Sequence, residues 1–396
     1  MSEELSEEVE NKPVVAICYD FDKTLSPNDM QAWDFIPKIG MDAKAFWDAS
    51  NERAKNNDMD INLSWMLKMK EESEGKEVFT KQKLINYGAG IELFPGVEAW
   101  FDKINAIGGR EGIRIEHYII SSGLKEMIEG TVLGQRQCFK KIYASSFYYN
   151  EKDIAVWPAQ VVNYTNKTQF LFRIEKGTLD VNDDKINEKF SLDKIRVPFR
   201  NIIYIGDSDT DIPCMKLVKS YGGYSIGVYN PKLEKDYMKT KVYKMIRDDR
   251  ISFFAPADYN EGSPLYNLVE NIICKTKYNE MLVKVHEENV YETENDYERK
   301  DERERLFDEL LTELEGSGSY ATTHSVVKKY SNENELFEKQ WKTKDLNYLA
   351  KIVLDNNQIS SILNDSDLTI FFRKMYNGYD GKNKDALAII NIIREE

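Results

Sequence analysis

The chain has 396 residues, of which 41% are hydrophobic and 12% aromatic, so it is long enough for two domains and can bury a substantial core. Its formal net charge of −14 argues against a protein that binds nucleic acid or an anionic membrane through a basic surface. No apolar run reaches the roughly 18 residues of a membrane span, and the acidic start Met1-Ser2-Glu3-Glu4 lacks signal-peptide character. We therefore expect a cytoplasmic protein.

The first predicted element is a buried strand at residues 14–19, an apolar run rich in β-branched side chains. Two carboxylates follow it directly, within Asp20-Phe21-Asp22-Lys23-Thr24. The C-terminal end of a strand is where an open α/β sheet places its ligand crevice. Taken alone, the two acids could equally solvate a loop or cap a helix, so their interpretation depends on the rest of the chain.

A helical insertion is predicted after this strand, because residues 27–90 are amphipathic and too many for a plain crossover. Asn28, Asp29 and Gln31 must enter or border the crevice, which makes them candidates for substrate specificity. Most of the insertion's large apolar side chains are expected to form its own core, with a minority closing over substrate: Trp33, Phe35, Phe46, Trp47, Trp65, Met66 and Met69.

Strands and helices alternate beyond the insertion. Strands are predicted at residues 117–120, 141–144, 201–205 and 223–228, helices at 97–107, 124–130, 167–176 and 211–219, and an excursion hairpin at 148–162. This alternation predicts an α/β fold with a Rossmann-like, doubly wound parallel sheet. We assign residues 12–26 and 91–275 to the α/β core and 27–90 to a helical cap inserted after strand 1.

Residues 276–396 are predicted to form a separate C-terminal helical region. Residues 287–315 are highly charged with helical propensity, Gly316-Ser317-Gly318-Ser319 is a flexible linker or a turn, and residues 347–354 and 387–393 have helical apolar periodicity. The region could be an oligomerisation arm, a partner-binding module or a second lid, and its composition does not decide between them.

Histidine and cysteine chemistry is a poor candidate for this chain. None of the three histidines, His117, His286 and His324, has a partner at metal-ligand spacing or lies beside a nucleophile. The four cysteines are isolated from one another, as expected for reduced thiols in a core: Cys18, Cys138, Cys214 and Cys274. Any chemistry must therefore use carboxylates.

A second group of acids follows the strand at 201–205, in Gly206-Asp207-Ser208-Asp209-Thr210-Asp211. Two strand ends that carry acids can face each other across the crevice of a doubly wound sheet. Several carboxylates in one pocket repel one another unless a cation lies between them, and oxygen ligands suit Mg²⁺. The alternative is a pair of acid-capped helices.

Two further segments have the chemistry to bind phosphate. Ser121-Ser122-Gly123 ends a third strand and precedes a helix, whose N-terminal amides favour an anion. Lys167, in Asn166-Lys167-Thr168, opens another helix and can bring a cation to the same crevice. Each signal is weak by itself, but together with the acids they supply what phosphoryl transfer requires.

In order and type, these motifs resemble those of the haloacid dehalogenase (HAD) superfamily of phosphohydrolases, over roughly residues 12–275. The place of the insertion, and Ser121-Ser122-Gly123 where a Ser-Gly-Gly turn is usual, are most similar to the phosphoserine-phosphatase-like branch. The resemblance implies that Asp20 is the nucleophile of an aspartyl-phosphate intermediate and that Asp22 is the general acid and base.

The same resemblance implies a Mg²⁺ cofactor held by the Asp20 carboxylate, the Asp22 carbonyl and Asp207, with Asp211 as a ligand or just behind one. Ser121 would bind a phosphoryl oxygen, and Lys167 would offset charge and position Asp20. Thr24, Ser122 and Gly123 would complete the phosphate site. Lys176 is a second candidate for the lysine, and the role of Asp209 stays open.

Asp22 favours a phosphomonoesterase or a phosphomutase, since dehalogenases of the superfamily lack an acid at this position. The expected activity is Mg²⁺-dependent hydrolysis of a small phosphorylated metabolite. The alternatives are a phosphomutase or phosphotransferase, and an interaction protein whose residues 276–396 bind a partner or a second copy.

Overall fold

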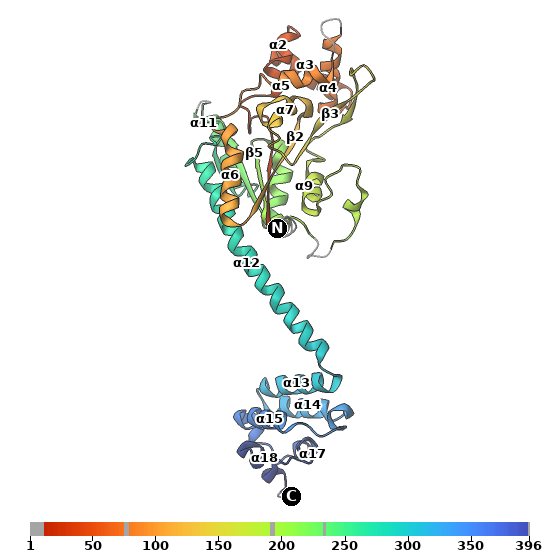
Figure 1. Cartoon of the computed structure of the whole chain (residues 1–396), viewed down its shortest axis with the longest axis vertical. Coiled ribbons are helices and arrows are strands. Elements are labelled where there is room, and N and C mark those ends of the chain that lie inside the picture. Colours follow the sequence, from red (N-terminus) through yellow and green to blue (C-terminus); the bar gives the residue numbers. More distant parts are fainter. Residues whose placement is uncertain (1–11, 75–78, 191–194, 233–234, 395–396) are drawn as a thin grey trace, which may run out of the picture. The chain divides into compact units, whose positions relative to one another are not determined.

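The structure is a computed structural model that describes residues 12–74, 79–190, 195–232 and 235–394. Contacts divide the chain into two compact units, residues 1–282 and 283–396. The first unit carries a β-sheet, and the second is helical (Figure 1). In the part of the chain that the structure describes, no helix is both long and apolar enough to cross a membrane.

A seven-stranded sheet in the order β4-β3-β2-β1-β5-β6-β7 forms the centre of the first unit. Neighbouring strands are parallel except β3 and β4, which form an antiparallel hairpin. This topology confirms the predicted Rossmann-like α/β fold. The strands are β1 (Val14–Tyr19), β2 (Arg114–Leu124), β3 (Lys141–Tyr149), β4 (Ala155–Gln160), β5 (Ile202–Gly206), β6 (Tyr224–Tyr229) and β7 (Phe253–Pro256).

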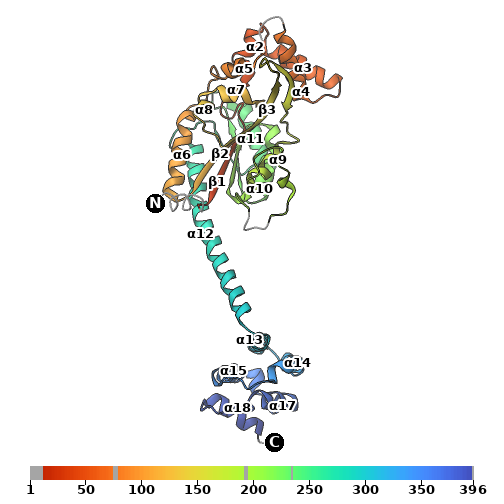
Figure 2. The same ribbon diagram turned by 45° about the vertical axis from the view of Figure 1, so that its right-hand side comes forward.

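Helices cover both faces of the sheet, and for this reason β1 is buried along its whole length. Val15, Ile17 and Tyr19 face the layer that contains α6 (Val97–Glu111) and the first turns of α12 (Pro264–Arg299). Ala16 and Cys18 face the other layer, which contains α9 (Lys167–Lys176), α10 (Ile212–Ser220) and α11 (Lys235–Arg247). Figure 2 shows α6 on one side of the sheet and α9 and α10 on the other.

The strand order reverses at β1, which lies between β2 and β5. The last residue of β1, Tyr19, is in register with Ile119 of β2 and Ile205 of β5. Residues that follow these three strands therefore meet at one edge of the sheet. Strand β2 runs past its predicted end at residue 120, and its register with β3 shifts between Ile120 and Leu124. The turn Ser121-Ser122-Gly123 is accordingly an irregular continuation of the strand.

The predicted cap is helical. It contains η1 (Met30–Ala32), α2 (Phe35–Lys38), α3 (Ala43–Asn56), α4 (Ile61–Ser73) and α5 (Lys81–Gly88), drawn in red to orange beyond the sheet edge in Figure 1. Asp42, Asp60 and Thr80 cap α3, α4 and α5 through side-chain oxygens. The large apolar side chains of these helices are mostly buried together, as expected for a core: Phe35, Phe46, Trp65, Met66 and Met69.

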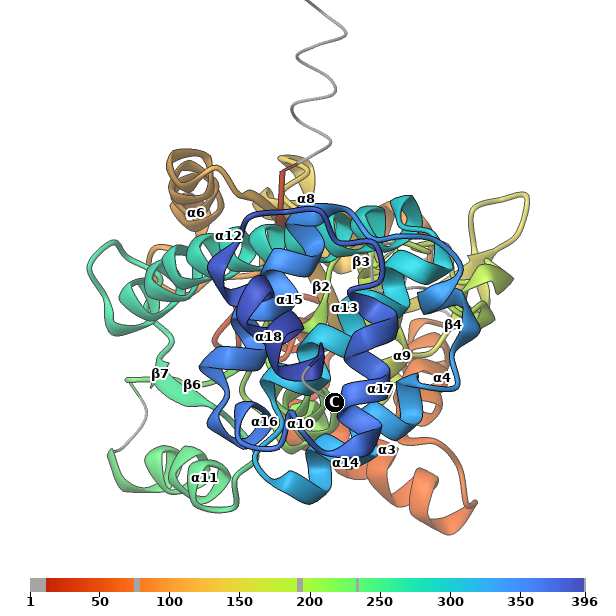
Figure 3. The same cartoon turned by 90° about the horizontal axis from the view of Figure 1, so that it is seen from below.

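The second unit has a separate apolar core built from α13 (Glu302–Glu315), α14 (Tyr320–Tyr330), η6 (Asn334–Phe337), α15 (Thr343–Asp355), α16 (Asn357–Ser360), α17 (Ser366–Met375) and α18 (Lys384–Arg394). Along this unit the colour changes from cyan at α13 to dark blue at α18 in Figure 3. The predicted helix at 287–315 is interrupted, because Asp301 caps a new helix by accepting the Glu304 N–H. The segment 316–319 is an ordered turn, in which Ser317 is buried and Ser319 caps α14.

The predicted boundary at residue 276 falls inside the continuous helix α12. Leu265, Val269 and Ile272 of this helix pack in the core of the first unit, whereas Leu282 and Tyr291 are exposed. The contact boundary lies after Leu282. A helix can continue beyond the surface it packs on, so a domain boundary need not coincide with a loop.

Candidate active site

Asp20 lies at the end of β1, where its backbone N–H donates to the Ile205 carbonyl at 3.0 Å. The chain then turns sharply: the N–H groups of Thr24, Leu25 and Ser26 all donate to the Phe21 carbonyl, and Lys23 has a positive φ of 60°. The carboxylate of Asp20 is thereby held at the switch point of the sheet, with the residue only 5% exposed.

Asp207 follows β5, and Asp211 ends the short helix η5 (Asp209–Asp211) just beyond it. Asp211 Oδ2 accepts hydrogen bonds from the Ser208 N–H at 3.1 Å and the Ser208 hydroxyl at 2.8 Å. A Cβ atom on Gly206 would lie 2.8 Å from Asp211 Cγ, so the close approach of the two segments requires a glycine. Asp209 is exposed and lies outside this cluster.

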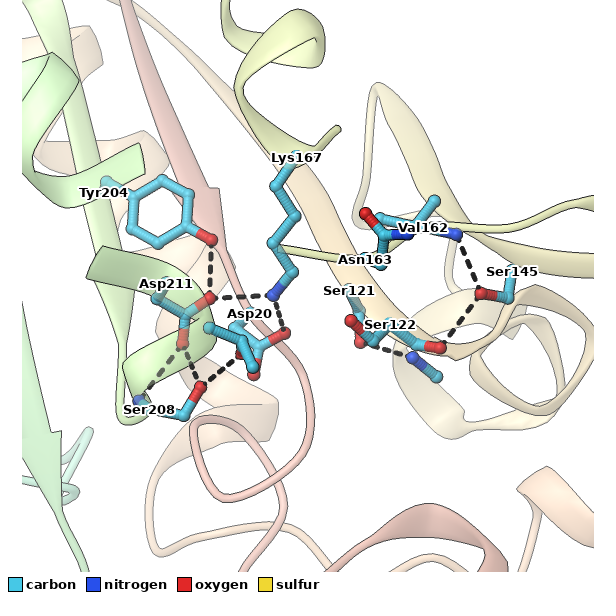
Figure 4. A network of polar contacts seen from close by, with 12 residues as sticks. Asp20, Ser121, Ser122, Ser145, Val162, Asn163, Lys167, Tyr204, Ser208 and Asp211 are labelled. Carbon is cyan, nitrogen blue, oxygen red and sulfur yellow. Dashed lines mark hydrogen bonds and ion pairs between the residues drawn. The ribbon is translucent and has the colours of Figure 1, made fainter. Parts of the chain in front are cut away.

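Lys167 connects the two acidic segments. Its Nζ lies 3.0 Å from Asp20 Oδ1 and 2.8 Å from Asp211 Oδ1, and the side chain is almost fully buried. Tyr204 donates to the same Asp211 oxygen at 2.8 Å. Figure 4 shows this group, with Lys167 reaching between Asp20 and Asp211. Lys176, the other candidate, donates instead to the carbonyls of Ile186 and Glu188.

Burial and mutual repulsion perturb these carboxylates. Burial and the charge of Asp211 raise the pKa of Asp20 to about 6, against the attraction of Lys167. Burial, Asp211 and Asp20 raise the pKa of Asp207 well above its ordinary value. Burial opposes ionisation of Asp211 as well, but Lys167, Tyr204 and Ser208 hold its pKa below the ordinary value. The three carboxylates therefore carry more negative charge than Lys167 neutralises.

Asp20, Asp207 and Asp211 fit a divalent cation. One carboxylate oxygen of each lies within 4.8 Å of the others, and all three residues are buried. Among the described residues, none donates a hydrogen bond to the Asp207 carboxylate, whereas both oxygens of Asp211 already accept two. Asp20 and Asp207 are therefore the better ligands, and Asp211 serves chiefly to hold Lys167. Oxygen ligands around excess negative charge suit Mg²⁺.

Asp22 lies outside this group of three carboxylates. Its Oδ1 accepts the Met30 N–H at 2.9 Å, so the side chain points to the first turn of the cap. Burial, followed by the charges of Asp29 and Asp20, raises its pKa well above the ordinary value. The predicted metal contact of Asp22 runs through its backbone carbonyl and stays a prediction. A carboxyl group that keeps its proton is suited to a general acid.

The predicted phosphate-binding residues lie beside Asp20. Ser121 is buried in the irregular last part of β2, the strand next to β1, and its Oγ accepts the Gly123 N–H at 3.1 Å. Thr24 is fully buried, and its Oγ1 has no hydrogen-bond partner in the described chain. Such an orphaned hydroxyl in the loop that carries Asp20 is available to a ligand.

The start of the cap packs against the phosphate-binding turn. Met30 Sδ accepts the Leu124 N–H at 3.1 Å, and a Cβ atom on Gly123 would lie 2.1 Å from Met30 Cε. Of the specificity candidates, Asp29 pairs with Lys23 at 2.8 Å. Gln31 is 2% exposed, with an Oε1 that lacks a partner among the described residues, and Asn28 is exposed.

His117 and His324 make their contacts outside this site, whereas Cys214 lies beside it: burial raises the pKa of its thiol, and the charges of Lys167 and Asp211 act on it. His117 lies within β2, as the predicted strand at 117–120 requires, and its Nδ1 is 3.0 Å from the Tyr19 hydroxyl. His324 lies in the second unit between Asp365 and Asp367. The four cysteines carry free thiols.

Three residues around these groups have no role predicted from the sequence: Tyr204, Ser208 and Ser145, the last of which bonds the Ser122 carbonyl and the Val162 N–H. Tyr204 lies in an apolar strand, where a tyrosine cannot be distinguished from a core aromatic residue. Ser208 could have been found, since a serine three residues before an aspartate matches a helix-capping pattern. Ser145 carries no local signal, because its hydrogen-bond partners are 23 and 17 residues away.

Comparisons with known proteins find a relative by sequence and several solved structures that resemble part of the chain. No family model matches the chain. A protein described as uncharacterized from Borreliella burgdorferi is 29% identical over 295 residues, which cover 67% of this chain and 98% of that protein. About a third of this chain therefore has no counterpart in that relative.

Among solved structures, a HAD family hydrolase from Salmonella enterica serovar Typhi is 18% identical, with a TM-score of 0.39 over 58% of this chain and 71% of its own. A substrate-bound phosphoserine phosphatase is 14% identical, with a TM-score of 0.38. The match covers 60% of this chain and 99% of the phosphatase chain. Cytosolic 5′-nucleotidase IIIB bound to cytidine is 16% identical, with a TM-score of 0.41. The match covers 69% of this chain and 91% of the nucleotidase chain. Because these similarities are low, what the site does has to be inferred from its own residues.

Proposed function

We propose that this protein is a phosphatase of the HAD superfamily that hydrolyses a small phosphomonoester with Mg²⁺ through an aspartyl-phosphate at Asp20. The observation that carries the proposal is the buried cluster formed by Asp20 and Asp207, which follow two adjacent parallel strands, together with Asp211 and Lys167. A neutral or structural ion-pair network would not leave Asp207 buried with a raised pKa and no donor among the described residues.

In the first step, an oxygen of the Asp20 carboxylate attacks phosphorus and the bond to the ester oxygen breaks. Asp22, two residues after the nucleophile, donates its proton to the departing ester oxygen. Bound Mg²⁺ would reduce the repulsion between the Asp20 carboxylate and the substrate phosphate and would orient the phosphoryl group. Lys167 holds Asp20 in place and offsets charge on the phosphoryl oxygens, and Ser121 offers a hydroxyl to one of them.

In the second step, water attacks the phosphorus of the aspartyl-phosphate, Asp22 takes the proton from that water, and inorganic phosphate leaves. Asp20 is then a free carboxylate again. The same two acids could pass the phosphoryl group to a second hydroxyl, as a phosphomutase or phosphotransferase does. We propose water as the acceptor, a small phosphorylated metabolite as the substrate, and the cytoplasm as the location.

The test is release of phosphate from a chromogenic phosphomonoester and from a panel of phosphorylated metabolites, with Mg²⁺ and with EDTA. We expect turnover only with Mg²⁺ and a loss of at least about a thousandfold in Asp20→Asn, since a nucleophile has no substitute. Asp209→Asn is the matched control, because it makes the same change two residues from Asp207 on an exposed side chain. It should retain wild-type turnover.

Undiminished turnover in Asp20→Asn, or turnover that ignores EDTA, would contradict the proposal. Phosphate that appears on a second position of the substrate, rather than in solution, would identify a mutase. Repeating the panel with a chain that ends after residue 282 tests whether the second unit contributes to specificity. Identical profiles would leave that unit a role in binding a partner or a second copy.

A further inference from the structure

Ser145 lies on β3, and its fully buried hydroxyl joins two segments that are distant in sequence. The hydroxyl donates to the Ser122 carbonyl at 3.0 Å and accepts the Val162 N–H at 3.1 Å. Figure 4 shows it between the phosphate-binding turn and the segment that leads to Lys167. One side chain thus bridges two parts of the site without belonging to either.

The segment after Val162 is tied closely to Lys167. The Lys167 N–H donates to the Asn163 carbonyl at 3.0 Å, and the Asn163 N–H donates to Asn166 Oδ1 at 2.8 Å. Asn166 Nδ2 in turn donates to the Val161 carbonyl at 2.9 Å. Because these bonds brace the turn from both sides, a displacement of Val162 would move the start of α9 and the lysine with it.

The other partner of Ser145 is equally constrained. Ser122 lies where the β2–β3 register shifts, and the turn is closed by the Gly123 N–H bond to Ser121 Oγ. Val162 lies beyond the end of β4 at Gln160, and the Ser145 hydroxyl makes one hydrogen bond with its N–H and another with the Ser122 carbonyl. Without it, the partly buried Ser122 carbonyl and the buried Val162 N–H would each lose this hydrogen bond.

We infer that Ser145 is a positioning residue that sets the separation between the phosphate-binding turn and Lys167. The inference rests on the function proposed above. Lys167 and Ser121 must contact different oxygens of one phosphoryl group, so their spacing decides how well the site fits that group. The cap shares the same segment, since Asn62 Nδ2 donates to the Val162 carbonyl at 2.8 Å and Asn163 Nδ2 to Asp60 Oδ2 at 2.7 Å.

The test uses Ser145→Ala, Ser145→Cys and Ser145→Thr in the full chain. Alanine removes the bridge, cysteine keeps the volume with a weak hydrogen-bonding group, and threonine keeps the hydroxyl. The adjacent Ser146→Ala is the matched control, because Ser146 is on the same strand and partly exposed. We expect kcat to fall at least about tenfold in the alanine and cysteine variants, with a smaller change in KM, and threonine to recover most of the loss.

A second readout does not depend on turnover. Mg²⁺ alone should raise the Tm of the wild type and of Ser145→Ala alike, because the metal-binding acids are unchanged. Inorganic phosphate added with Mg²⁺ should raise the Tm further in the wild type, and this increment should be mostly lost in Ser145→Ala and Ser145→Cys. If the alanine variant does not fold, the cysteine variant carries the comparison.

The inference fails if Ser145→Ala keeps wild-type kcat and the full phosphate increment, or if Ser146→Ala loses as much. It also fails if the Ser145 variants have a lower Tm but unchanged kcat and an unchanged phosphate increment, since that would show a purely structural role. A wild type with neither turnover nor a phosphate increment would instead overturn the proposed function. The two failures are therefore distinguishable.

Discussion

Replacing the proposed nucleophile should make the metal-free protein more stable while abolishing its activity. Asp20 is buried beside Asp211, and Lys167 offsets only part of the repulsion. Asp20→Asn removes one negative charge and keeps the size of the side chain. Active sites commonly retain such destabilising groups because catalysis needs them.

The size of the gain follows from the pKa of Asp20, which rises from 3.8 to about 6. A difference of about two units, at roughly 1.4 kcal/mol each, corresponds to about 3 kcal/mol at pH 7. A carboxyl with a raised pKa destabilises the folded state once it ionises, so its penalty is absent below pH 3.8 and complete above about pH 6. The advantage of the variant should therefore fall to about half at pH 5.

The measurement is urea unfolding of wild type and Asp20→Asn after dialysis against EDTA, at pH 7 and pH 5. Comparing the two proteins at each pH cancels groups that titrate in both. Saturating Mg²⁺ should then reverse the order, because the wild type has the additional ligand and gains more from binding. An Asp20→Asn protein that is less stable than wild type in EDTA at pH 7 would refute the reasoning, and Asp209→Asn should show no gain.

Two other positions give predictions of a different kind. Burial lowers the pKa of His117 to about 3. Below about pH 6.5 the histidine is therefore protonated in the unfolded chain and still neutral in the folded chain. The free energy of unfolding should consequently decrease by about 2 kcal/mol between pH 7 and pH 5. In His117→Gln this part of the pH dependence should disappear from urea unfolding curves, and an unchanged slope would argue that the histidine is charged. Gly123→Ala would place a Cβ atom 2.1 Å from Met30 Cε and 3.2 Å from Asp22 Oδ2, so kcat should fall. Met30→Ala should restore part of the loss in the double variant, and equal losses with and without Met30 would contradict this steric explanation.

Local patterns were sufficient where one element determined the outcome. Helix α9 begins at Lys167 and ends at Lys176, as its periodicity predicts. The apolar strand before Asp20 and the one before Asp207 are both present and parallel. In contrast, β7 has only four residues, two of them substantially exposed phenylalanines, and it had no pattern strong enough to predict.

The connection between the parts of the site depended on packing. The resemblance favoured Lys167 over Lys176, but a helical pattern that contains both lysines does not show which side chain contacts the acids. The structure places Lys167 on the first turn, facing Asp20, and turns Lys176 toward the carbonyls of Ile186 and Glu188. Ser145 is the extreme case, because its two partners come from other elements of the sheet domain.

The sequence by itself determined the fold class and the chemical character of the site, because strand ends that carry acids, a serine turn and a lysine are local properties of the chain. Tertiary structure alone decided that Asp211 binds Lys167, that Asp207 is left without a donor among the described residues, and that Asp22 turns toward Met30. Those outcomes depend on distances of a few ångströms between strands and helices, and such distances are set by side-chain packing across the whole sheet.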